Sequence, residues 1–121
     1  MGEAFVILLH VGHGQDHYDL MLPAGDALAT WRVETDPAKL AAGESAPAGR
    51  LADHRSAYLT YEGPVSRGRG QVSRVAGGTC RTIARRDDYW EFELASDAVA
   101  GAFELARVGP GEDDWRLTRS R

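Results

Sequence analysis

Two histidines and one aspartate of this sequence have the types and spacing of metal ligands. His17 and Asp19 are one residue apart, and His10 ends an apolar segment seven residues before His17. Side chains alternate between the faces of a strand, so His17 and Asp19 would share a face, and an antiparallel neighbour ending at His10 would add a second imidazole. Such a set suits manganese, iron or zinc and leaves coordination positions open for a substrate. A hydrogen-bonded His–Asp pair without an ion fits the same pattern, and His13 is an alternative ligand.

Length and composition predict one globular domain over residues 1–121, and we expect it to be a monomer. Hydrophobic residues make up 43% of the chain, and no apolar run is long enough to span a membrane. The start of the sequence lacks the basic and long apolar segments of a secretion signal, so we expect a cytoplasmic protein. Cys80, the single cysteine, cannot form an internal disulfide and is interpreted as a small strand residue.

The charge distribution argues against a general nucleic-acid-binding surface but permits a local phosphate site. The net charge is −4, whereas non-specific binding of nucleic acid needs clustered cations. All basic residues except Lys39 are arginine, which grips phosphate through paired hydrogen bonds, although a GC-rich genome gives the same bias. Residues 63–70 are rich in glycine and contain Arg67 and Arg69, which is compatible with a phosphate-binding loop or with a plain hairpin turn.

Short strand-like segments separated by turns predict an all-β fold. We expect a closed or nearly closed antiparallel β-barrel of short strands with little helix. The expected strands are residues 5–10, 17–22, 28–34, 51–54, 58–62, 70–75, 79–84, 89–95, 100–108 and 115–118. Residues 77–78 and 109–111 are interpreted as hairpin breaks, and residues 36–49 mainly as a loop with a short helical turn at 37–42.

His54 and Tyr58 follow the loop expected at residues 36–49 and could also take part in chemistry. An imidazole near a metal can act as a general acid or bind phosphate, and a tyrosine hydroxyl can donate a hydrogen bond to a phosphoryl oxygen. Taken alone, each side chain is more typical of a structural role. Their spacing does not suit one straight strand face, so we expect a bend after His54.

With these residues placed, most of the chain resembles the 3′-phosphoesterase module of bacterial DNA ligase D. The resemblance includes an apolar strand ending in histidine at residues 5–10 and a His-Tyr-Asp strand at residues 17–22. A Leu-x-x-Trp-x-Val segment follows at residues 28–33. The most specific match is Asp-His-x-x-x-Tyr-x-x-aromatic-Glu-Gly, found here at residues 53–63.

The resemblance implies a β-barrel that holds manganese, or another divalent transition metal such as zinc. It implies removal of a terminal phosphate or ribonucleotide from 3′ ends of DNA before ligation. His10, His17 and Asp19 would hold the ion, while His54 and Tyr58 would contact the scissile phosphate. The implied partners are DNA 3′ ends and, beyond them, a DNA ligase or other end-joining proteins.

One departure from the family pattern concerns the cation that clamps the phosphate. The family has an arginine two residues after the aspartate, where this sequence has Met21. Losing such a contact costs roughly 3 kcal/mol, or about a hundredfold in rate. Arg50 and Arg55 are the predicted phosphate ligands, with Arg67 and Arg69 as alternatives. The chain is therefore predicted to be a metal-dependent phosphoesterase or, as the alternative, a non-catalytic barrel that binds DNA ends or repair partners.

Overall fold

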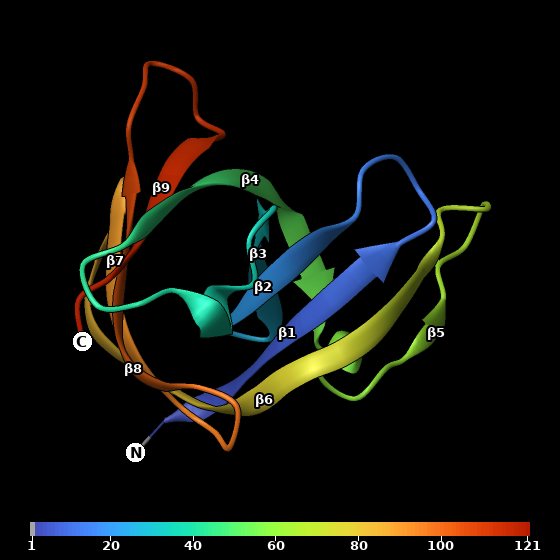
Figure 1. Cartoon of the computed structure of the whole chain (residues 1–121), viewed down its shortest axis with the longest axis horizontal. Helices are drawn as coiled ribbons and strands as arrows, with labels where there is room; N and C mark the ends of the chain where they lie inside the picture. Colours follow the sequence, from blue (N-terminus) through green and yellow to red (C-terminus); the bar gives the residue numbers. More distant parts are fainter. Residues whose placement is uncertain (1) are drawn as a thin grey trace.

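A closed antiparallel barrel of eight strands forms the body of the molecule, which is described over residues 2–121 by a computed structural model (Figure 1). The strands follow the order β1-β2-β3-β4-β9-β8-β7-β6, β6 pairs with β1 to close the barrel, and β5 lies beside β6 as an extra strand. The elements are β1 (Glu3–Val11), β2 (His17–Ala24), β3 (Ala27–Val33), η1 (Pro37–Lys39), β4 (Ser45–Arg55), η2 (Ser56–Leu59), β5 (Gly63–Pro64), β6 (Gln71–Arg86), β7 (Tyr89–Ala95), β8 (Ala100–Arg107) and β9 (Asp114–Arg119). The predicted all-β barrel with little helix is confirmed.

Alternate side chains of every barrel strand fill the interior. Trp31 packs edge to face against Trp90 and Trp115, with ring centroids 5.8 and 5.4 Å away. Cys80 is a small strand residue buried in this core. Burial, and to a smaller extent the nearby Glu3 carboxylate, raise the pKa of its thiol to about 12. Since the interior takes one set of side chains, the other set on β1, β2 and β3 faces outward.

A second, smaller core lies on the outer face of these strands. Residues 56–70, called here the covering segment, fold back over the barrel wall beside β1 and β6 (Figure 1). The side chains buried beneath this segment are Val6, Leu8, Met21, Leu28 and Val72, and Tyr58, Leu59 and Val65 pack on them from above. Several outward-facing side chains of β1 and β2 are therefore buried rather than exposed to solvent.

The predicted hairpin break at residues 77–78 is wrong, because β6 continues through both glycines. A Cβ on Gly78 would collide with the carbonyl oxygen of Ala95, and one on Gly77 would collide with the Arg74 guanidinium. Gly78 is required for this close approach of two backbones within the wall of the barrel, whereas the flexible Arg74 side chain could move away from a Cβ at position 77.

Two further segments differ from the prediction. Strand β4 begins at Ser45, inside the stretch interpreted as a loop, because Ala46 and Ala48 are buried between β3 and β9. Residues 58–62 were expected to form a strand, but Tyr58 ends up in η2, where it packs on the second core. The short helical turn after Asp36 is present as η1. Across residues 2–121, no helix has the length and apolar character needed to cross a membrane.

Candidate active site

Strands β1 and β2 bring the three predicted metal ligands together on the outer face of the barrel. His10 lies directly opposite His17 in the β1–β2 register, and Asp19 follows on the same face of β2. The ligand atoms of the three side chains all lie within 4.8 Å of one another. His10 Nδ1 is 3.4 Å from Asp19 Oδ2, and His17 Nε2 is 3.1 Å from Asp19 Oδ1. His17 and Asp19 are buried, so this group of three, called here the triad, is largely shielded from water.

Hydrogen bonds on the far side of each imidazole determine which ring nitrogen faces Asp19. His10 Nε2 donates to the carbonyl of Arg69 at 2.6 Å, and His17 Nδ1 donates to the carbonyl of Gln15 at 3.1 Å. Because a carbonyl oxygen only accepts, these nitrogens carry hydrogens, and in its neutral form each ring presents a lone pair to Asp19. Carbonyl partners of this kind orient histidines that bind metals.

The inner side of the triad is rich in acceptors and lacks a donor. Asp19 Oδ1 is buried and has no hydrogen-bond partner among residues 2–121. Such an unpaired buried oxygen costs about 1–3 kcal/mol or more, and lone pairs facing a carboxylate add repulsion. A cation between these atoms would remove both costs, so two nitrogens and a carboxylate oxygen fit a divalent transition metal.

His13 lies beside the triad but is not part of it. Its ring centroid is 6.4 Å from that of His10, and the side chain is exposed in the loop between β1 and β2. Of the two alternative ligands, the geometry therefore favours His10.

A cavity of about 540 Å³ opens next to the triad. His54 and Tyr58 line the same cavity as the triad. The other lining residues are His13, Arg32, Leu51, Ala52, Asp53, Arg55, Val65, Ser66 and Arg69. The structure thus brings the three predicted metal ligands, the two predicted catalytic side chains and one predicted phosphate ligand, Arg55, around one space.

A β-bulge in β4 turns His54 toward this cavity. Thr30 pairs with Leu51 while Leu28 pairs with His54, so β4 contains one extra residue between these two pairs. Before the bulge, Arg50 pairs with the inward-facing Trp31. The extra residue reverses the alternation, and His54 faces outward beside Leu28.

His54 and Tyr58 meet where the chain leaves the barrel wall. The expected bend after His54 is present, because β4 ends at Arg55 and the chain enters η2. The two rings are edge to face, with centroids 5.3 Å apart. His54 Nδ1 donates to the carbonyl of Ala52 at 3.0 Å, which leaves Nε2 for another partner. The hydroxyl of Tyr58 has no hydrogen-bond partner in the described part of the chain.

Arginines outnumber carboxylates around the cavity. The cations are Arg32, Arg55 and Arg69, and the carboxylates are Asp19 and Asp53. Arg69 is tied to its own loop, because its guanidinium donates to the carbonyl and the hydroxyl of Ser66 at 2.9 and 3.0 Å. A protein that is acidic overall therefore has a locally basic cavity, as a phosphate site requires.

The structure does not bring Arg50 or Arg67 to this cavity. Arg50 lies before the bulge, stacks 4.6 Å from the centroid of Trp31, and forms an ion pair with Asp53 at 2.8 Å. Its guanidinium also donates to backbone carbonyls of β3 and β4, so Arg50 stabilises the junction of these strands. Arg67 is exposed at the tip of the covering segment.

Arg32 is the lining residue that the sequence interpretation missed. Gly25 and Asp26 form a two-residue turn between β2 and β3, and the resulting register places Arg32 directly opposite Asp19. Counting pairs outward from that turn would have found Arg32. Met21 shares the outer face with Asp19, but it is 1% exposed in the second core and does not line the cavity.

A comparison with family models identifies the family. The model for the DNA ligase D 3′-phosphoesterase domain matches residues 10–107, a range that contains the triad, His54 and Tyr58. This chain belongs to the DNA ligase D 3′-phosphoesterase family. Membership of the family implies a 3′-phosphoesterase-type role in DNA end repair, with DNA ends as the substrate. The search of curated proteins gives no matching relative.

Proposed function

We propose that this member of the ligase D 3′-phosphoesterase family removes the phosphate from 3′ ends of DNA at a divalent metal ion. The metal would be held by His10, His17 and Asp19, and manganese is the proposed ion, with zinc as the alternative. The observation that supports the proposal most strongly is the triad itself. His17 Nε2 faces the buried Asp19 Oδ1, which has no hydrogen-bond partner within residues 2–121, and His10 Nδ1 faces the other oxygen of the same carboxylate.

The reaction would replace the bond between phosphorus and the deoxyribose 3′-oxygen with a bond between phosphorus and the oxygen of water. The products are inorganic phosphate and a 3′-hydroxyl end, which a DNA ligase can use. A divalent ion held by the triad would polarise phosphoryl oxygens and make water a better nucleophile. The remaining requirements are a proton for the departing 3′-oxygen and donors for the charge on the phosphoryl group.

His54 and Tyr58 are the proposed catalytic residues. The Nδ1 hydrogen of His54 is committed to the carbonyl of Ala52, so Nε2 is the atom that would deliver a proton to the 3′-oxygen. The Tyr58 hydroxyl would donate a hydrogen bond to a non-bridging phosphoryl oxygen. Arg55, which is exposed on the rim of the cavity, would bind a backbone phosphate of the DNA strand.

Phosphate release from an oligonucleotide with a 3′-phosphate, measured with and without Mn²⁺, tests this proposal. His54→Ala should slow release by roughly a hundredfold or more, and Tyr58→Phe by about tenfold or more. Tyr61→Phe is a matched control, because Tyr61 packs against Tyr58 but does not line the cavity. An oligonucleotide ending in a ribonucleotide tests the other implied activity, which is removal of that ribonucleotide.

Wild-type protein that binds such ends yet releases nothing with Mn²⁺ or Zn²⁺ would refute hydrolysis. That result would establish the non-catalytic DNA-end-binding function instead.

A further inference from the structure

Arg32 occupies a position next to the proposed metal site that no other cation shares within residues 2–121. It lies directly opposite Asp19 in the β2–β3 register, and residues paired in this way have Cβ atoms about 4.5–5.5 Å apart. Both side chains are on the outer face of the barrel, and both line the cavity that contains His54 and Tyr58. A group bound at the triad would therefore lie within reach of the Arg32 guanidinium.

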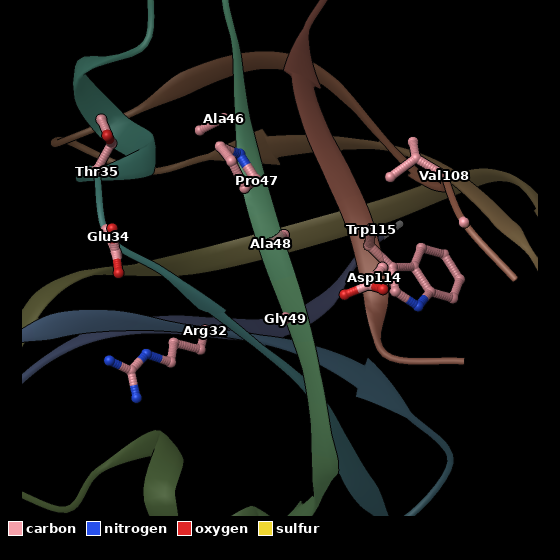
Figure 2. Close-up of a pocket in the computed structure, with 11 residues that line it drawn as sticks. Arg32, Glu34, Thr35, Ala46, Pro47, Ala48, Gly49, Val108, Asp114 and Trp115 are labelled. Carbon is pink, nitrogen blue, oxygen red and sulfur yellow. The ribbon is translucent and has the colours of Figure 1, made fainter. Parts of the chain in front are cut away.

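Arg32 is partly buried, yet its guanidinium has no hydrogen bond or ion pair in the described part of the chain. Asp19 is not within ion-pair distance of it, because that carboxylate faces the two histidines instead. Arg32 also lines a neighbouring cavity with Glu34 and Asp114, and Figure 2 shows its side chain apart from both carboxylates. Five N–H donors are thus free for a ligand.

The other arginines near the site differ from Arg32 in this respect. Arg69 is bonded to Ser66, and Arg50 is paired with Asp53 outside the cavity. Arg55 is unpaired within residues 2–121 but exposed, and it lies opposite Ala27, at the far end of β3 from Arg32. Only Arg32 combines free donors with a place beside the triad.

We propose that Arg32 binds the terminal 3′-phosphate of DNA and makes this cavity selective for 3′-phosphate over 3′-hydroxyl ends. A terminal phosphate carries more negative charge than an internal phosphodiester, and a guanidinium can bind two of its oxygens at once. Arg55 would serve a different purpose, since a cation at the rim contacts backbone phosphates that both kinds of end possess. The inference rests on the proposed function, because it uses the same cavity.

The test compares the affinities of 3′-phosphate and 3′-hydroxyl oligonucleotides by fluorescence anisotropy, with a chelator present to prevent turnover. Wild-type protein should prefer the 3′-phosphate, and Arg32→Ala should reduce that preference by about ten- to a hundredfold. Arg32→Lys should keep part of the preference, since it keeps the charge but not the fork of donors. Arg116→Ala, an equal charge change at an exposed β9 position away from the cavity, should keep all of it.

A purely structural role for Arg32 is checked by melting temperature and by Mn²⁺ affinity. Removing a cation cannot weaken metal binding electrostatically, so Arg32→Ala should bind Mn²⁺ at least as well as wild type. An unchanged preference in Arg32→Ala would overturn the inference, as would wild-type protein that does not distinguish the two ends. If the wild type prefers 3′-phosphate through Arg32 but releases none with metal, the inference stands and the proposed hydrolysis is wrong.

Discussion

Asp19→Asn should weaken metal binding and at the same time stabilise the metal-free protein. The substitution keeps the shape of the side chain but removes the single anionic ligand of the triad. A pair of opposite unit charges 4 Å apart is worth about 4 kcal/mol near a protein surface, and a divalent ion at bonding distance gains more. We therefore expect Mn²⁺ affinity to fall by about a thousandfold or more.

The gain in metal-free stability comes from the unpaired oxygen. Asp19 Oδ1 is buried without a donor among residues 2–121, and lone pairs of His10 and His17 face this carboxylate. An asparagine amide in its place can donate to one of these nitrogens. Relief of one unsatisfied buried group is worth about 1–3 kcal/mol. For a domain of this size, that gain raises the melting temperature by roughly 3–10 °C.

Thermal unfolding with chelator and with a series of Mn²⁺ concentrations measures both effects. Metal at a hundredfold excess over its dissociation constant stabilises the wild type by about 2.7 kcal/mol, whereas Asp19→Asn should gain almost nothing. Asp53→Asn is the matched control, because Asp53 lines the same cavity but is paired with Arg50 rather than with the triad. Equal metal-induced stabilisation of wild type and Asp19→Asn, or a metal-free Asp19→Asn that melts lower than wild type, would refute this account of the triad.

Three other variants or reactions probe the fold. Gly70→Ala should destabilise the protein, because φ is +77° at this position and a Cβ would collide with the backbone carbonyl of Val11. It should also weaken metal binding, because the preceding residue, Arg69, supplies the carbonyl that orients His10. Circular dichroism melting and Mn²⁺ titration measure the two effects. Arg81 and Arg121 lower the pKa of Glu93, so the ionised carboxylate stabilises the fold above about pH 4.5 and this effect is lost as the pH falls. In urea unfolding, the difference in free energy of unfolding between wild type and Glu93→Gln should shrink from pH 6 to pH 3. Cys80, with its pKa raised to about 12 by burial, should react with a disulfide reagent at pH 8 roughly a thousandfold more slowly in native than in unfolded protein.

Most of the triad and much of the barrel could be predicted because they depend on local alternation. His17 and Asp19 share a face for the same reason that Leu20 and Leu22 share the opposite one, and one antiparallel pairing adds His10. The turn residues around Gly25 fixed the β2–β3 register equally well. The same register, counted from the turn along β2 and β3, pairs Arg32 with Asp19, so Arg32 could have been predicted as well.

The remaining differences arise from long-range packing. The glycines at positions 77 and 78 have the signature of a turn, and only the proximity of Ala95 and Arg74 explains their place inside a strand. The bulge that turns His54 outward depends on how β4 pairs with β3, which no short sequence window reveals. Tyr58 has a high strand propensity, but burial on the second core places it in a 3-10 turn instead.

The covering segment couples two parts of the site that are far apart in the sequence. Its first turn carries Tyr58, and its last residues supply the Arg69 carbonyl that orients His10. Opening of this segment would therefore displace Tyr58 and free His10 from the carbonyl that orients it in one event. By thermodynamic reciprocity, an ion bound at the triad restrains the segment as strongly as the segment strengthens the ion's binding. If an ion binds at the triad as proposed, its affinity should therefore fall when the segment is destabilised, and removing the ion should make the segment open more often.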